Sequence, residues 1–123
     1  MNVWFLLAGC TSALTMLVHC ILGGREIARP LLVATDIHAV AKYTNYYCWH
    51  LVSLTLAAMA GCFLWAAFHP DGIELAVLAG LLAVAFCVWN LGLIVWKGQR
   101  FDHMPQWAMF LSVSALAAPG FWG

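Results

Sequence analysis

The chain has 123 residues, of which 65% are hydrophobic and 8% are charged, and its formal net charge is zero. A soluble domain carries about 25% charged residues, so this composition excludes a water-exposed globular domain and predicts a protein that is solvated by the lipid bilayer. The sequence also has no basic stripe, which argues against nucleic acid as a partner.

Four apolar segments follow one another along the chain. Each predicts a membrane-spanning helix, because about 20 apolar residues cross the hydrocarbon core of a bilayer. The predicted spans are residues 3–23, 46–68, 73–96 and 107–121, of which the last is the shortest. We therefore predict one all-α domain over residues 1–123, an integral membrane bundle of four transmembrane helices.

The first span is predicted to end at a Gly-Gly break that begins at Gly23, with a long connection after it. Pro30 blocks a simple continuation of the helix, and the apolar run that begins with it predicts a short amphipathic or re-entrant segment in the first cytoplasmic loop. Asp36 is the expected N-cap of the next helix, which should begin near Ile37.

All five lysine and arginine residues lie in two connections, residues 24–45 and 97–106. The positive-inside rule places both connections in the cytoplasm and both ends of the chain outside. The tight turn His69–Gly72 carries no basic residue and is expected on the outer side. The sequence thus predicts a multi-pass protein of the cell inner (plasma) membrane with an N-out, C-out topology.

Each predicted span carries one face of small or polar residues at helical spacing, as expected where helices pack in lipid. We expect these faces to turn toward the interior of the bundle. They comprise Ser12, Thr15, His19, Gly23 and Glu26 in the first span; Tyr46, His50, Ser53, Ala57 and Gly61 in the second; Gly80, Ala83, Cys87 and Asn90 in the third; and His103, Gln106, Phe110 and Ser114 in the fourth.

Polar side chains within spans face the interior of a bundle and often mark function. With a rise of about 1.5 Å per residue, the histidines of the first two spans lie at similar depth near the cytoplasmic end. We therefore predict a polar pocket at that end, built on His19 and His50. Glu26, Asp36, Asn90, His103 and Gln106 supply its rim in this prediction.

Two imidazoles on neighbouring helices are also potential ligands for a transition metal ion, with His103 as a third ligand, or for haem. No HxxxH or ExxH pattern places two ligands on one helix, so the metal signal is weak. The alternative role is structural, because a histidine near a helix end also hydrogen-bonds a neighbouring carbonyl and joins two helices. Asn90 has the same alternative, as a clasp between helices.

Four short motifs follow one another along most of the chain. These are His-x3-Gly-Gly from His19, Pro-Leu-Leu at 30–32, Trp-His at 49–50 and Pro-Gln-Trp at 105–107. In this order the chain resembles small, uncharacterised four-helix bacterial integral membrane proteins. The resemblance implies the helical bundle and singles out the same two histidines, and it implies no activity.

The functional hypothesis is a small inner-membrane protein whose histidine pocket binds a metal ion or a small polar ligand. One alternative is a non-catalytic accessory subunit of a larger membrane complex, or a homodimer. The small-residue runs Ala57–Gly61 and Ala115–Gly120 would allow close helix approach in such an assembly. The other alternative is a membrane enzyme that acts on a lipid or a quinone, with a histidine as acid or base.

Overall fold

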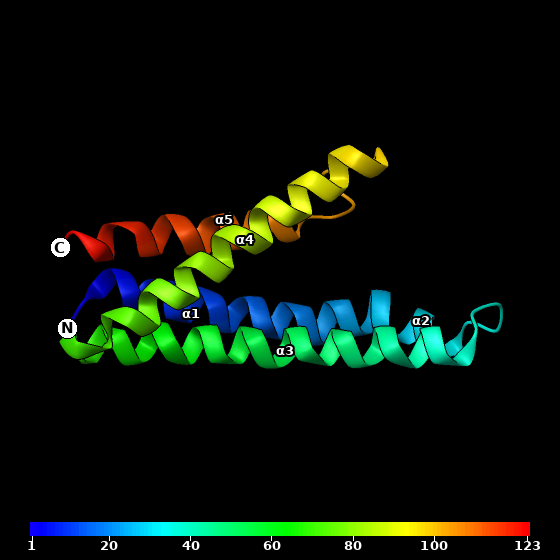
Figure 1. Ribbon diagram of the computed structural model, residues 1–123, viewed down its shortest axis with the longest axis horizontal. Helices are drawn as coiled ribbons and strands as arrows, with labels where there is room; N and C mark the ends of the chain where they lie inside the picture. Colours follow the sequence, from blue (N-terminus) through cyan, green and yellow to red (C-terminus); the bar gives the residue numbers. More distant parts are fainter.

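The computed structural model describes all 123 residues, and every regular element in it is helical (Figure 1). Three helical stretches are long and apolar enough to cross a membrane: Val3–Val33, Ala39–Phe68 and Pro70–Lys97. The elements are α1 (Val3–Val18), a π-helical segment (His19–Ala28), α2 (Arg29–Val33), α3 (Ala39–Phe68), a 3-10 turn (Pro70–Gly72), α4 (Ile73–Lys97), α5 (Gln106–Ala117) and a final 3-10 turn (Ala118–Phe121).

The first helix does not end at Gly23, because the π-helical segment His19–Ala28 carries it through the Gly-Gly pair and into α2. In a π-helix each N–H bonds the carbonyl five residues back, which makes a wider turn. A wider turn accommodates Pro30, whose ring clashes with the preceding carbonyl in an ordinary α-helix and which has no N–H to donate. The predicted amphipathic or re-entrant segment is therefore an extension of the first helix, and the connection is reduced to residues 34–38.

The second long helix begins at Ala39, two residues later than expected, and Asp36 is not its cap. His38 takes that place, because its Nδ1 accepts a hydrogen bond from the Val40 N–H at 3.3 Å. With 30 residues and a rise of about 1.5 Å each, α3 is longer than the hydrocarbon core is thick. No residue of α3 before Leu56 is buried, so its first turns extend beyond the packed core.

The third and fourth predicted segments agree closely with α4 and α5. α4 ends at Lys97, where Gly98 adopts a left-handed conformation with φ 61° that suits a residue without Cβ. α5 is a short helix, and the 3-10 turn after it extends the helical stretch to Phe121. Pro105 precedes α5 as its N-cap and provides no side-chain hydrogen bond.

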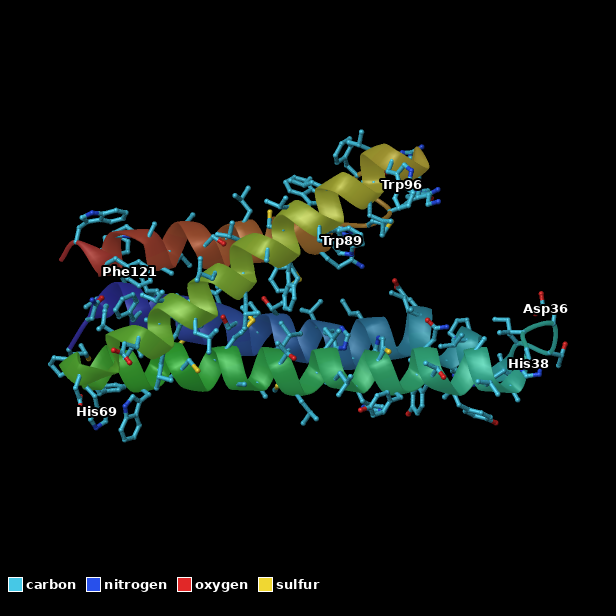
Figure 2. The ribbon with its side chains drawn as sticks, in the orientation of Figure 1. Asp36, His38, His69, Trp89, Trp96 and Phe121 are labelled. Carbon is cyan, nitrogen blue, oxygen red and sulfur yellow. The ribbon has the colours of Figure 1, made fainter.

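The helices run back and forth between two ends (Figure 1). α1 packs against both α3 and α5, while α4 packs against α3 and α5 and crosses the others obliquely. The two ends of the chain lie together at one end, near His69 and Phe121 (Figure 2). Asp36 and His38 lie at the opposite end with the connection between α2 and α3, and the C-terminal half of α4 diverges from α3.

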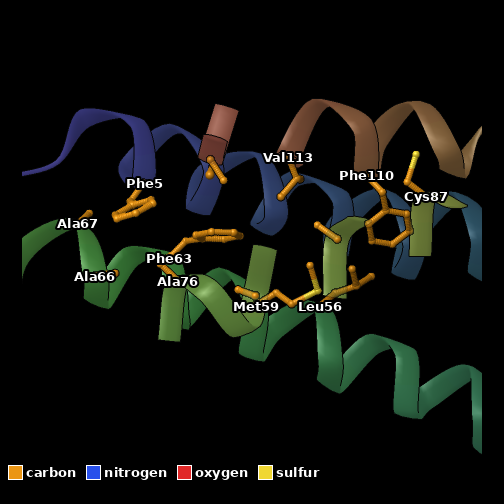
Figure 3. Close-up of a cluster of buried hydrophobic side chains, with 14 residues drawn as sticks. Phe5, Leu56, Met59, Phe63, Ala66, Ala67, Ala76, Cys87, Phe110 and Val113 are labelled. Carbon is orange, nitrogen blue, oxygen red and sulfur yellow. The ribbon is translucent and has the colours of Figure 1, made fainter. Parts of the chain in front are cut away.

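The core is a cluster of apolar side chains around Phe63 of α3, which is 0% exposed (Figure 3). The ring of Phe5, from α1, has its centroid 6.2 Å from that of Phe63 and 5.0 Å from that of Phe121. α4 contributes only small buried side chains to this cluster, and small residues allow helices to approach closely. These are Ala76, Ala79, Ala83 and Cys87.

α3 turns a different face inward from the one predicted. His50, Ala57 and Gly61, which belong to the predicted inner face, are exposed. The buried residues of α3 are Leu56, Met59, Ala60, Phe63, Ala66 and Ala67. The helix is thus rotated by about one residue, or roughly 100°, because its large apolar side chains fill the space that small residues on the other helices leave.

Asn2 fastens the two ends of the chain to the end of α3, a role that the sequence pattern did not reveal. Its backbone N–H donates to the Ala67 carbonyl at 2.7 Å, and its side-chain amide donates to the Gly120 carbonyl at 2.8 Å. The same side chain accepts hydrogen bonds from the Trp4 and Phe5 N–H groups and caps α1. This one residue therefore joins three helix ends.

Candidate functional site

A cavity of about 230 Å³ opens between the first helix, α3 and the start of α5. No residue of α4 lines it. Its polar lining is Thr15, His19, Glu26, His103 and Gln106, and its apolar lining is Val18, Leu22, Ile27, Val52, Leu56, Pro105, Met109 and Phe110, with Gly23 between them. The cavity therefore combines an apolar wall with a few convergent polar groups, as small-molecule sites do.

The structure brings together four of the residues predicted for the pocket and leaves three apart. The four are His19, Glu26, His103 and Gln106, which all line the cavity. The other three, Asp36, His50 and Asn90, do not line it. His19 and Glu26 lie together because they share one face of the first helix. His103 and Gln106 join them because the connection between α4 and α5 and the start of α5 lie at the same level of the bundle.

His19 is held in place by Trp49 of α3. The two rings stack with centroids 4.2 Å apart and an interplanar angle of 22°, and the His19 Nε2 lies 3.2 Å from the Trp49 carbonyl oxygen. Because a carbonyl oxygen only accepts, Nε2 must be the protonated nitrogen of this ring. His19 therefore acts as the joint between helices that the structural alternative described, and it also lines the cavity.

The place predicted for His50 is taken by its neighbour Trp49. The Trp49 indole lies against Gly23, where a Cβ atom would be 3.7 Å from its Cζ2. His50 is exposed and packs edge-on against Tyr46 and Trp49, with centroid distances of 4.6 and 5.3 Å. The rotation of α3 is the cause. The apolar residues Trp49, Leu56 and Phe63, which recur every seven positions, are the feature of the sequence that indicates this rotation.

Gln106 has the clearest unmet hydrogen-bonding need in the cavity. Its Oε1 is buried and has no hydrogen-bond partner, a state that it shares only with the Ser12 hydroxyl among buried side-chain polar atoms. Leaving such an acceptor unpaired costs about 1–3 kcal/mol. The oxygen is itself enclosed by protein atoms, so in this geometry a ligand in the cavity does not reach it.

Asn90 joins two helices, α4 and α5, which is the alternative role predicted for it. Its Oδ1 accepts a hydrogen bond from the Trp107 N–H at 3.0 Å. This N–H lies in the first turn of α5, where no carbonyl of the helix is available to accept it. Asn90 thereby fixes the start of α5 to α4 and positions Gln106, the first residue of α5, at the cavity.

Charged groups near the cavity are few. Glu26 lines it without an ion-pair partner, because the one ion pair in the structure joins Arg100 and Asp102 at 2.8 Å. The Arg100 guanidinium donates two hydrogen bonds to the Asp102 carboxylate, which lowers the pKa of that carboxyl from its ordinary value. This exposed pair lies in the connection between α4 and α5, next to His103.

No group of three or more histidine, cysteine, aspartate or glutamate side chains is arranged to hold a metal ion. Of the predicted metal ligands, His19 and His103 line the cavity, and His50 does not. Metal or haem binding by these three residues stays a prediction that this geometry does not favour.

Comparison of the chain with protein-family models, with curated proteins and with solved structures gives no match. The functional conclusion therefore depends on the cavity and on the surface of the helices.

Proposed function

We propose that this protein is a multi-pass inner-membrane protein that binds a small ligand in the cavity between its first helix, α3 and α5. The support for membrane insertion is the three long apolar helices together with the many large apolar side chains on their surface, such as Leu14, Leu54, Leu81 and Val88. These side chains find a favourable environment in lipid and an unfavourable one in water.

In the proposed topology α5 and its 3-10 extension form a fourth span, and both ends of the chain lie outside. The common position of the two chain ends supports an even number of crossings (Figure 1). The five basic residues all lie in residues 24–45 and 97–106, at or near the opposite end of the bundle, which supports a cytoplasmic location for those regions.

A reporter fusion checks this topology. Alkaline phosphatase attached after Gly123 is expected to be active, because the enzyme matures only outside the cytoplasm, and attached within residues 34–38 it is expected to be inactive. The measurement is phosphatase activity of whole cells normalised to fusion level. Activity at residues 34–38, or none after Gly123, would contradict the proposed orientation.

Ligand binding is supported by one observation above the others, a cavity of about 230 Å³ whose apolar wall carries a few polar side chains, among them His19, Glu26 and Gln106. A small molecule with a polar head and an apolar part would meet both features. Enzymatic chemistry has less support, because the lining contains no serine or cysteine and the Thr15 hydroxyl donates to the Thr11 carbonyl.

The accessory-subunit alternative has a weaker basis. An apolar groove between α4 and α5, which includes Gly80, Ala117 and Phe121, is a surface where another helix would fit. Lipid chains fill such a groove equally well, and nothing else in the structure identifies an occupant. Ligand binding is therefore the better supported proposal.

Blocking the cavity tests the proposal. Val52 lines the cavity and Val88 is a lipid-facing residue of α4 outside it. We expect native mass spectrometry of the protein from lipid nanodiscs to detect a bound small molecule in wild type and in Val88→Phe, and to detect none in Val52→Phe. The larger ring at position 52 takes up the space that the ligand needs.

Two results would overturn this proposal. One is a wild-type spectrum without any bound small molecule, and the other is equal retention in Val52→Phe. Stoichiometric zinc or haem in the purified protein would favour the metal hypothesis instead, so metal analysis and an absorption spectrum belong to the same experiment.

A further inference from the structure

The five basic side chains of the protein differ in their surroundings. The Arg100 guanidinium is neutralised by the Asp102 carboxylate at 2.8 Å, and the Lys97 ammonium lies over the Trp96 ring, 4.0 Å from its centroid. The pair between Arg100 and Asp102 is the only ion pair in the structure, so the remaining three basic side chains have no acidic partner. These three are Arg25, Arg29 and Lys42.

The alignment of the first helix with α3 places two of these residues at one level. The His19 ring stacks on Trp49, and further along the pair α2 packs against α3. Lys42 lies about two turns before Trp49 on α3. Arg29 lies about two turns after His19, because the turns of the π-helical segment contain more residues than those of an α-helix. Ala28 is buried and Lys42 is half-buried here, so the two helices are still in contact at this level.

This level corresponds to the headgroup layer of a bilayer. Asn2 and Ala67, joined by a hydrogen bond, mark the opposite end of the same helix pair. About 25 residues of unbroken α-helix separate Lys42 from Ala67, which is about 38 Å at a rise of about 1.5 Å per residue. That distance exceeds the hydrocarbon core of about 30 Å and is less than the whole bilayer of about 40–45 Å. Tyr43 and Tyr47 are exposed beside Lys42, and tyrosine is enriched at this depth.

Two acidic residues share this connection and leave the basic side chains free. Glu26 lines the cavity between the first helix, α3 and α5. Asp36 lies at the far tip of the helix pair (Figure 2). Neither carboxylate forms an ion pair, so the three positive charges are available to an anion from the bilayer.

We propose that Arg25, Arg29 and Lys42 bind the phosphate of an anionic phospholipid in the leaflet on the side of the basic connections, which is the inner leaflet in the proposed topology. Arg25 and Arg29 are exposed and four residues apart, on one face of the first helix. A guanidinium donates two parallel hydrogen bonds to a phosphate, and a lysine ammonium adds a compact positive charge. None of the three residues lines the cavity, so this lipid site is separate from the proposed ligand site and depends only on membrane insertion.

A titration with three probes tests the site. Dioleoylphosphatidylglycerol is anionic, dioleoylphosphatidylcholine has the same chains and a zwitterionic head, and glycerophosphoglycerol is the anionic head without chains. Native mass spectrometry of the full-length protein in detergent gives the dissociation constant of the first bound molecule of each. We expect phosphatidylglycerol to bind roughly tenfold or more tightly than phosphatidylcholine, and the free head not to bind detectably.

Two results of this titration would overturn the proposal. Equal dissociation constants for the two lipids would show that the basic side chains do not select an anionic head. Binding of glycerophosphoglycerol as tight as that of phosphatidylglycerol would show that the site takes a soluble phosphate ester and not a lipid.

Three charge-removing variants separate a defined site from general charge attraction. Lys42→Gln and Arg29→Gln are each expected to weaken phosphatidylglycerol binding roughly fivefold. Arg100→Gln is the matched control, because it removes the same charge from a side chain that Asp102 already neutralises, and it should change the affinity by less than about twofold. Equal losses in all three variants, or no loss in Arg29→Gln and Lys42→Gln, would refute the site. Since Arg29 is exposed, its replacement does not disturb the packing of the helices.

The cavity-blocking variant distinguishes this inference from the proposed function. Val52→Phe is expected to keep the phosphatidylglycerol affinity of the wild type, because Val52 lines the cavity and the three basic residues do not. Loss of phosphatidylglycerol binding in Val52→Phe would place the lipid in the cavity and overturn the separate site. If the wild type binds phosphatidylglycerol selectively and no small molecule is found in the cavity, the lipid site stands and the proposed ligand binding fails.

Discussion

Replacing Phe63 by alanine is expected to destabilise the folded protein by about 3–5 kcal/mol, the range for removing a fully buried aromatic ring. The ring is 0% exposed at the centre of the core and packs against Phe5 (Figure 3). Phe5 in turn contacts Phe121. Its loss leaves a cavity where α1, α3 and the C-terminal turn meet. The surrounding residues of α4 have side chains that are too short to fill this cavity.

Phe68→Ala is the matched control, because that ring is 57% exposed at the end of the same helix. The measurement is the free energy of unfolding from SDS titration in mixed micelles, followed by circular dichroism. The control is expected to change it by less than about 1 kcal/mol, as surface substitutions usually do. Equal effects of the two substitutions would show that Phe63 does not occupy the core described here.

The ends of the helices could largely be predicted from the sequence. The predicted boundaries at Phe68 and Ile73 coincide with the observed ones, and the predicted end at Trp96 differs from the observed end at Lys97 by one residue. Local composition decides these positions, because a turn such as His69–Gly72 stops a helix whatever lies around it. The end of the first helix was mispredicted, since a π-helical segment removes the conflict that a proline creates in an α-helix.

The inward face of α3 could not be predicted in the same way. Two faces about 100° apart each offered a consistent pattern, one small and polar through His50 and Gly61, the other large and apolar through Trp49 and Phe63. The choice depends on the shape of the other helices. Since α1 and α4 contribute mainly small residues to the contact, the bulky face of α3 fills the interior.

The same reasoning explains which candidate residues meet. His19 and Glu26 belong to one helical face, and the grouping of residues three and four apart is a local property. Gln106 lies near them because α5 packs against α1, and Asn90 fixes the start of α5 through the Trp107 N–H. The side chain of Pro105 does not cap α5, so the Trp107 N–H in its first turn needs an acceptor from another helix. This requirement is the feature of the sequence that could have indicated the role of Asn90.

Substituting Gly9 by alanine is expected to destabilise the protein by about 1–3 kcal/mol, the cost of overpacking a close contact. A Cβ atom at Gly9 would lie 2.8 Å from the Leu64 Cγ and 3.1 Å from the Leu64 backbone nitrogen. A side chain can rotate away, but a backbone nitrogen moves only with its helix, so α1 and α3 would have to separate along their contact. Glycine at this position is therefore a requirement of helix packing.

Gly61 provides the matched comparison within α3, because a Cβ atom there meets nothing within 4 Å. Gly61→Ala is expected to stabilise the protein by about 0.5–1 kcal/mol, since glycine in a helix interior is less favourable than alanine by that amount. The two substitutions add the same methyl group to a helical glycine, so opposite signs in the same SDS titration would isolate the effect of contact between α1 and α3. If both variants gain stability, α1 and α3 do not approach each other at Gly9 as closely as described, and the cavity bounded by these two helices would have a different shape.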